Sequence, residues 1–182
     1  MGDALTGRIN LRRTSSLAPR ELAFGGLFGA AALALPALFH LVQLGHIFMP
    51  MYIPLMALPF FVRWGVAGTT ALLVPMLSAV ITGMPPLMPP IAPVMSVELA
   101  LMAGVLAALR VRWPGVTPVA LLVPVLIAGR FVNAGLMYLI SRALDLPAVF
   151  VAGISFFAGW PGVLLMIVVI PPVALLARKL HG

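Results

Sequence analysis

The chain alternates long apolar stretches with short turns that are polar or rich in proline. Residues 22–62, 64–97 and 146–177 contain no Asp, Glu, Lys or Arg, and a helix needs only about 20 predominantly apolar residues to cross a bilayer. Six such spans fit along the chain. They are predicted at residues 19–43, 46–64, 65–82, 93–109, 116–141 and 150–176. The expected fold is therefore an all-α integral membrane protein with six transmembrane helices.

The second predicted span is the least regular of the six. It contains Pro50, Pro54 and Pro59, and proline removes a backbone donor and kinks or breaks a helix. Irregular backbone at membrane depth is tolerated only where protein or a water-filled cavity covers it. We therefore expect this span to be short or kinked, or to be partly re-entrant.

Composition and charge placement agree with a membrane location. Of the 182 residues, 63% are hydrophobic and 8% are charged, against about 25% charged in a typical soluble domain. The net charge of +7 does not indicate a nucleic-acid partner, because the basic residues lie at span ends, where they encode topology. With a cytoplasmic N-terminus, Arg142 lies outside. The basic residues that lie inside are Arg8, Arg12, Arg13, Arg20, Arg63, Arg110, Arg112, Arg178 and Lys179.

This distribution predicts that both termini are cytoplasmic. It divides the chain into a polar N-terminal tail (residues 1–18), a membrane domain (19–178) and a short C-terminal tail (179–182). A basic leader before an apolar run is also typical of a signal peptide, but the run at 19–43 exceeds the about 7–15 residues of a signal core. We interpret it as a retained span.

A proline-rich loop precedes an isolated acid. Residues 83–93 contain five prolines, which should prevent a helix through this range. Glu98 follows within the next predicted span. Because the topology places the loop outside, a rigid apolar loop would lie beside a buried carboxylate, and the two together suggest the mouth of a binding site.

Arg130 is the second ionisable residue inside an apolar span. A charge at membrane depth costs at least about 2.5 kcal/mol, so Glu98 and Arg130 should face the bundle interior with a partner. Asn133 and Met137 follow Arg130 on one helical stripe. Two interpretations remain open: the ion pair locks two helices together, or it lines a ligand pocket.

Aromatic and histidine side chains give weaker signals. Phe156, Phe157 and Trp160 are spaced to share a helical face, where they would stack on a planar ring or pack in the core; Tyr52 and Tyr138 are pocket or interfacial residues. His40 and His46 lie six residues apart and do not form a paired metal or heme site. His46 is either a ligand contact or a solvated interfacial residue.

Small residues are concentrated on the first span. They form overlapping pairs four residues apart, Gly25 with Gly29 and Gly26 with Ala30. This spacing lets another helix approach closely, and it suits an external partner or a neighbour in the same bundle equally well.

Several chemistries are excluded. The chain has no cysteine, and its single lysine, Lys179, lies in the C-terminal tail, so it contains no phosphate-binding G-x-x-x-x-G-K-[ST] loop. Hydrolase and metalloprotease motifs are absent as well. We expect a binding protein that is not an enzyme and that has no cofactor or metal.

Four segments resemble the S components, the substrate-binding subunits, of energy-coupling factor (ECF) transporters. They are G-H-I-F-M-P-M-Y-I-P (residues 45–54), R-W-G-V-A-G (63–68), P-M-L-S-A-V-I-T-G-M-P-P-L-M-P (75–89) and V-E-L-A (97–100). The resemblance implies a six-helix subunit of a prokaryotic cell membrane that captures a vitamin or related micronutrient from outside. A transmembrane T component and two ATPases would then drive import.

The resemblance also implies residue roles. Gly25, Gly26, Gly29 and Ala30 match the docking surface for the T component. The residues that match the gate and walls of the substrate pocket are His46, Tyr52, Met84, Leu87, Met88, Glu98, Arg130, Asn133 and Trp160. Met137, which shares a helical stripe with Arg130 and Asn133, is a further candidate for the pocket. The alternative function is a non-catalytic membrane anchor or structural subunit of a larger complex.

Overall fold

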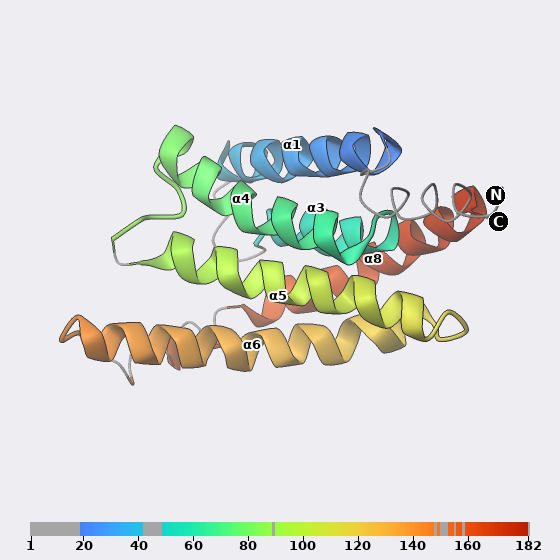
Figure 1. Ribbon diagram of the computed structural model, residues 1–182. Helices are drawn as coiled ribbons and strands as arrows, with labels where there is room; N and C mark the ends of the chain where they lie inside the picture. The colour runs from blue at the N-terminus through green and yellow to red at the C-terminus, as the bar shows by residue number, and fades with distance from the viewer. Residues whose placement is uncertain are drawn as a thin grey trace, which may run out of the picture.

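The computed structural model describes residues 19–41, 49–88, 90–147, 149, 153–154, 156–157 and 159–181. Every element within these residues is helical, and no strand occurs among them (Figure 1). The elements are α1 (Pro19–Leu41), α3 (Tyr52–Ala57), the 3-10 helix η3 (Leu58–Phe60), α4 (Trp64–Thr82), α5 (Ile91–Arg112), α6 (Pro118–Ala143) and α8 (Trp160–His181). The predicted all-α class is confirmed for this part of the chain.

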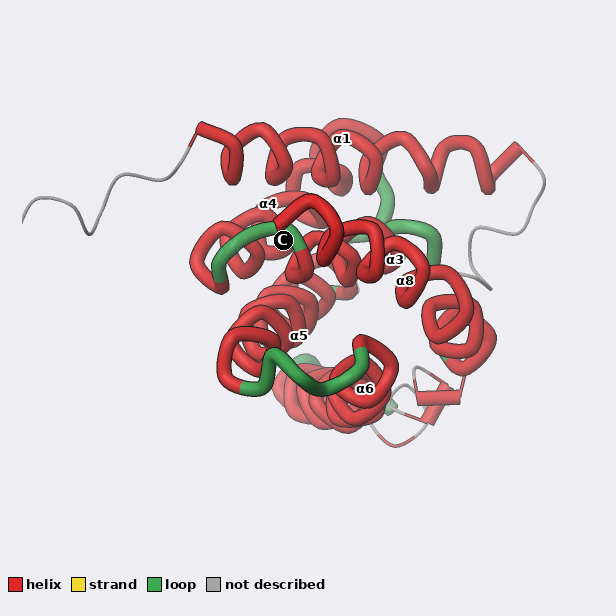
Figure 2. Tube along the Cα trace, turned by 90° about the vertical axis from the view of Figure 1, so that its right-hand side faces the viewer, coloured by secondary structure: helices red, strands yellow, loops and turns green. Residues whose placement is uncertain are grey.

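Four of these helices are long and apolar enough to cross a membrane. They are α4, α5, α6 and the Trp160–Ala177 part of α8. Helix α1 has 23 residues and runs across the bundle in Figure 2, where α5 and α6 are seen nearly end-on. The chain therefore has the helices of a multi-pass membrane protein.

The predicted second span is short in the structure. Its described part folds as α3, with six residues, followed by η3, with three. At rises of about 1.5 to 2.0 Å per residue, such a segment covers roughly half of a bilayer's hydrocarbon core at most. It contacts α1, α5 and α8, and its burial among them explains why an irregular backbone is tolerated there.

Two helix boundaries differ from prediction. The expectation that prolines prevent a helix as far as residue 93 is wrong, because α5 begins at Ile91 and includes Pro93 in its first turn. First-turn N–H groups have no partner within the helix, so a proline there costs little. The expectation of one continuous helix over 150–176 is also wrong, since Gly159 lies in a turn and α8 begins at Trp160.

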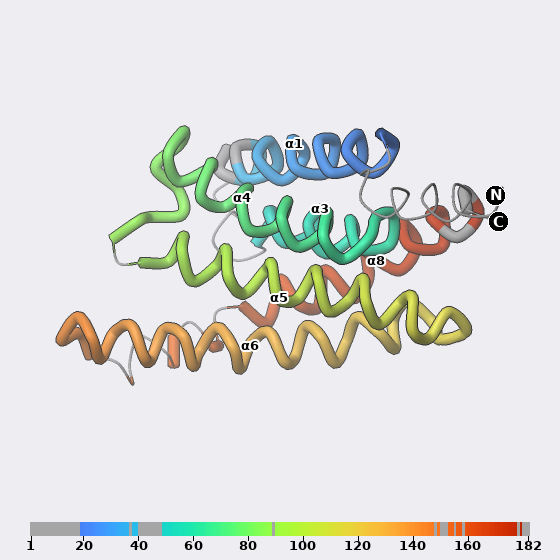
Figure 3. The backbone as a smooth tube through the Cα atoms, in the orientation of Figure 1, coloured from blue at the N-terminus to red at the C-terminus, as the bar shows by residue number. Residues whose placement is uncertain are grey.

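The connections are divided between the two ends of the bundle. The start of α1, the turn at 113–117 and the end of α8 lie at one end, whereas the 83–90 loop and the 144–147 turn lie at the other (Figures 1 and 3). At the first end, Glu21 of α1 pairs with Arg63, and Nη1 of Arg110 donates to the carbonyl of Phe60. These contacts join α1, η3, α4 and α5 where the basic residues collect.

The apolar core surrounds the short α3 and η3 segment. Leu55, Met56 and Leu58 are fully buried there, and they belong to one cluster with Leu99 of α5 and Met166 of α8. At one margin of this core, α3, α5 and α6 bring polar side chains together.

Candidate functional site

Three helices contribute to a buried polar cluster, which we define as Tyr52 of α3, Glu98 of α5 and Arg130 and Asn133 of α6. Glu98 is fully buried, and the other three side chains are at most 8% exposed. Buried ionised groups are stable only when they are paired and hydrogen-bonded. The contacts within the cluster show how this requirement is met.

Glu98 is the acceptor at the centre of the polar cluster. Its Oε1 lies 2.7 Å from Nη2 of Arg130. Its Oε2 accepts a hydrogen bond of 2.7 Å from Nδ2 of Asn133 and one of 2.6 Å from the hydroxyl of Tyr52. The predicted pairing of Glu98 with Arg130 is confirmed, and both carboxylate oxygens are occupied by donors from neighbouring helices.

Arg130 is held less completely than its partner. Its guanidinium carbon lies 5.7 Å from the centroid of the Tyr52 ring, a distance that suits a cation–π interaction. Nη1 lies 3.9 Å from the sulfur of Met49, a weak acceptor. Nε is buried and has no hydrogen-bond partner among the described residues. The cluster thus retains a buried donor that its own side chains do not satisfy.

Gly159 makes room for the Arg130 guanidinium. A Cβ atom placed on Gly159 would lie 1.9 Å from Nη1 of Arg130 and 3.1 Å from the terminal methyl of Met49, so a larger residue requires Arg130 to move. Sequence reasoning missed Gly159, and it included Met49 only as part of the 45–54 segment that resembles S components. A glycine followed by Trp160 and Pro161 inside an apolar run was the available signal for a break at this position.

The geometry of α5 and α6 explains the convergence. Arg130 and Asn133 lie one turn apart on one face of α6, and Met137 is buried one turn farther along. Glu98 lies seven residues after the start of α5, about 10 Å along the helix axis. This depth places the carboxylate below the end of the bundle that carries the 83–90 loop.

Other predicted site residues lie away from these contacts or outside the described residues. Met84, Leu87 and Met88 are 54%, 44% and 73% exposed in the loop. The loop is fixed by Ser78, whose hydroxyl donates to the carbonyl of Met84 at 2.6 Å. His46 lies outside the described residues.

The predicted aromatic residues Phe156, Phe157 and Trp160 do lie together, and their rings pack against one another. Phe156 lies edge-on to Trp160, with ring centroids 5.9 Å apart, and it contacts Phe131 of α6 and Phe157 at 5.4 Å each. Trp160 is half-buried against the core. Tyr138 is 40% exposed, as expected of an interfacial side chain.

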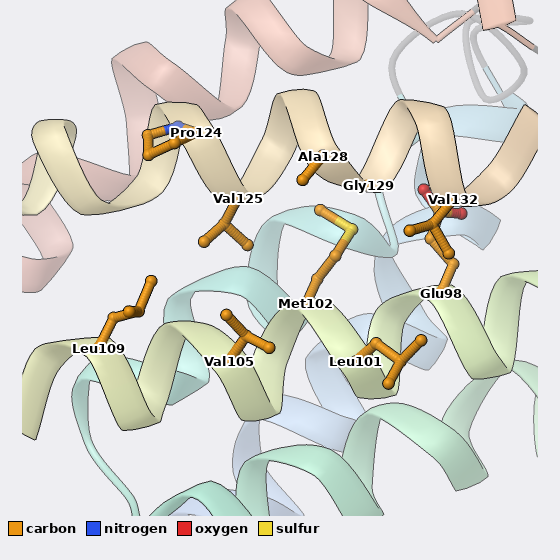
Figure 4. A pocket seen from close by; sticks show the side chains of 10 residues that line it. All are labelled: Glu98, Leu101, Met102, Val105, Leu109, Pro124, Val125, Ala128, Gly129 and Val132. Atoms are coloured by element: carbon orange, nitrogen blue, oxygen red, sulfur yellow. The ribbon is translucent and has the colours of Figure 1, made fainter.

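A groove between α5 and α6 meets the polar cluster at Glu98. Its volume is about 290 Å³, and Figure 4 shows Met102 pointing across it toward Gly129. Nine apolar residues line it with Glu98: Leu101, Met102, Val105, Leu109, Pro124, Val125, Ala128, Gly129 and Val132. No pattern in the sequence indicated this groove.

The small residues of α1 divide between two environments. Gly25 and Gly29 are buried, and Cβ atoms placed on them would contact Thr70 of α4 at 3.1 and 3.5 Å. Gly26 and Ala30 are exposed and, with Gly25 and Gly29, border a groove of about 700 Å³ between α1 and α4. Internal packing therefore uses half of the stripe.

No metal site is assembled by the described residues, in which no three His, Asp or Glu side chains come together. The candidate chemistry is therefore that of the polar cluster itself, which offers charge-assisted hydrogen bonds and an aromatic face. Comparison with family models, curated proteins and solved structures gives no match to this chain.

Proposed function

We propose that this protein is the substrate-binding membrane subunit of an ECF-type ABC importer in a prokaryotic cell membrane. The observation that carries the proposal is the buried Glu98–Arg130 pair with its Tyr52 and Asn133 contacts. Ionisable residues within a membrane-spanning region are functional candidates by default, because their burial is costly. The resemblance of residues 45–100 to S components supplies the class of function.

The proposed topology has six spans with both termini in the cytoplasm. Arg20, Arg63, Arg112 and Lys179 lie on segments that reach one end of the bundle. Arg142 lies in the last turn of α6, and α6 ends at the other end of the bundle (Figure 1). This asymmetry supports a cytoplasmic location for the first end. The polar cluster then lies nearer the outer end of α5, on the side from which a vitamin or related micronutrient would arrive.

The proposed partners are a T component and two ATPases, which would supply the energy that this chain cannot. Gly26 and Ala30 are the exposed members of the small-residue stripe and would contact the T component. Gly25 and Gly29 contribute to the same surface indirectly, since they allow α1 to lie close to α4.

The second candidate function is a structural membrane subunit in which the polar cluster locks helices together. It is favoured by the occupation of both Glu98 oxygens within the protein. A lock needs no small molecule, whereas a receptor must release or rearrange part of the cluster to admit one. Ligand content and partner subunits therefore discriminate between the two functions.

The test is mass spectrometry of small molecules released from the purified protein, together with its co-purifying subunits. An importer subunit should yield a micronutrient, a T component and ATPases. Glu98→Gln should weaken binding of that micronutrient about a hundredfold, which corresponds to about 2.7 kcal/mol. Glu21→Gln is the matched control and should leave the affinity unchanged. Equal affinity of the Glu98→Gln variant and the wild type would contradict the assignment of the pocket.

A further inference from the structure

Arg130, the cation of the polar cluster, has different neighbours at its two terminal nitrogens. Nη2 lies 2.7 Å from Glu98, whereas Nη1 lies beside Met49 and Gly159. The contact at Nη1 is weak, since the Met49 sulfur is 3.9 Å away and a thioether is a poor acceptor. A stronger acceptor would therefore gain most at Nη1.

The polar cluster has donors that its own acceptors do not satisfy. The two oxygens of Glu98 already receive hydrogen bonds from Arg130, Asn133 and Tyr52. Nε of Arg130 is buried with no partner among the described residues. The charges of Glu98 and Arg130 balance each other, and a buried charge without a counter-ion is costly. A ligand that suits the cluster therefore brings an acceptor oxygen without a charge.

The Met49 side chain covers Nη1 of Arg130. A Cβ atom placed on Gly159 would lie 1.9 Å from Nη1 and 3.1 Å from the terminal methyl of Met49, so Met49 and the guanidinium meet over a residue without a side chain. Met49 is only partly buried against the core. Because a methionine side chain is unbranched and adaptable, its rotation would open a route from the surface to Nη1.

The backbone of Met49 has an unusual conformation. Its φ is +47°, in the left-handed region that residues other than glycine rarely adopt, and the following Pro50 favours an extended residue before it. The Met49 carbonyl accepts a 2.9 Å hydrogen bond from the N–H of Tyr52, which ties this conformation to the start of α3. Backbone strain of this kind concentrates at functional sites, and here it holds a side chain against the buried guanidinium.

We infer that the Met49 side chain occupies the place of a ligand carbonyl, and that the substrate presents an uncharged amide or lactam oxygen to Nη1 of Arg130 when Met49 moves aside. This inference rests on the proposed binding role and specifies its substrate class. The carbonyl lies beside Gly159, and the Tyr52 ring stays on the guanidinium. The rearrangement that admits the ligand is the departure of Met49 from Arg130.

The test uses the full-length protein in phosphatidylcholine nanodiscs and saturation-transfer NMR titrations, with empty nanodiscs as the blank. The probes are three molecules of similar size: valerolactam, a neutral ring amide; cyclohexanecarboxylate, an anion; and piperidine, which has no acceptor oxygen. Valerolactam should bind, and each of the other two should bind at least about tenfold more weakly, because a site built for one hydrogen-bonding group rejects analogues that lack it.

Variants at Met49 and Gly159 test the position of the carbonyl. Met49→Ala should strengthen valerolactam binding about tenfold or more, because a binding-competent state populated to about 10% or less lowers the apparent affinity by that factor. Met49→Leu keeps the bulk and should bind no better than the wild type. Gly159→Ala places a methyl group against Nη1 and should abolish binding. Gly135→Ala is the control, because its methyl group would have no atom within 4 Å.

Three results would overturn the inference. The first is equal valerolactam affinity in the wild type, Met49→Ala and Gly159→Ala. The second is absence of valerolactam binding to both the wild type and Met49→Ala, and the third is tighter binding of cyclohexanecarboxylate than of valerolactam. Thermal unfolding identifies any variant that has lost its fold. If Gly159→Ala does not fold, the comparison of Met49→Ala with Met49→Leu decides the inference.

Failure of this inference differs from failure of the proposed function. If a micronutrient is recovered together with importer subunits and Met49→Ala does not change its affinity, the site at Met49 is overturned while the transport role stands. If no importer subunits co-purify but valerolactam binds more tightly to Met49→Ala than to Met49→Leu, the site is supported and the transport role is overturned.

Discussion

Two Glu–Arg pairs among the described residues differ mainly in their surroundings. Glu21 and Arg63 lie 2.9 Å apart at the basic end of the bundle, with side chains that are 15% and 53% exposed. Glu98 and Arg130 lie 2.7 Å apart in the interior, where they are fully and 98% buried respectively. Water competes for the first pair and is excluded from the second. Breaking the buried pair should therefore destabilise the protein much more than breaking the exposed pair, although the distances are similar.

The exposed pair joins two helix starts. Glu21 lies in the first turn of α1, and it accepts hydrogen bonds of 2.9 Å from both the backbone N–H and Nε of Arg63, the residue before α4. A carboxylate at helix N-termini is favoured by the helix dipoles. Water cannot replace a lost partner in the buried pair. The hydrogen bonds of Tyr52 and Asn133 also need the Glu98 carboxylate as their acceptor.

The largest effect is expected when the buried pair is broken from one side. Arg130→Met leaves the Glu98 carboxylate without its counter-ion and should destabilise the protein by about 3–5 kcal/mol. The double variant Glu98→Gln/Arg130→Met removes both charges and keeps an acceptor for Tyr52, so it should recover most of that loss. Thermal unfolding in detergent measures both. A double variant no more stable than Arg130→Met would contradict the account of Glu98.

Removal of a single donor should cost less. Tyr52→Phe keeps the ring beside Arg130 but deletes the hydroxyl that donates to Glu98 at 2.6 Å. Hydrogen bonds to charged groups contribute about 1.5–3 kcal/mol, and the loss of stability should fall in that range. Tyr138→Phe, at an exposed tyrosine, is the control in the same unfolding assay and should be near neutral. Equal effects would show that the buried hydroxyl has no special role.

Gly159 tests whether Arg130 must stay in place. Gly159→Ala puts a methyl group 1.9 Å from Nη1 of Arg130, and overpacking of this kind costs about 1–3 kcal/mol. Gly129→Ala meets the flexible Met102 side chain instead. It should destabilise the protein less, because Met102 can rotate, whereas Arg130 is held by its ion pair with Glu98. The unfolding temperatures of the two variants measure which one loses more stability, and ligand affinity is a second measurement. A larger loss for Gly129→Ala would show that Met102, and not Arg130, is the side chain that cannot move.

The smallest effect is expected at the exposed pair. Glu21→Gln weakens the contact with Arg63 but leaves both side chains accessible to water, and exposed pairs contribute about 0–1 kcal/mol. The change should be further reduced by added salt, which screens exposed charges. Unfolding temperatures at low and high salt measure this dependence. A salt-independent loss as large as that of Arg130→Met would remove the distinction between the two pairs.

The sequence by itself determined where α4 and α6 lie and that Glu98 and Arg130 need partners. Apolar run length located α4 and α6 to within two residues at each end, because a membrane-spanning helix satisfies its backbone within its own segment. The cost of an isolated charge then required Glu98 and Arg130 to have partners. Both conclusions depend on local composition and need no knowledge of which helices are neighbours.

Only the tertiary structure decided what surrounds that pair. Tyr52 lies 46 residues from Glu98 in sequence, and its donation depends on the short α3 packing beside α5. The role of Gly159 depends on where the start of α8 meets Arg130, and the α5–α6 groove depends on side chains from two helices. Such contacts are set by helix packing in three dimensions, which the periodicity of a single segment does not encode.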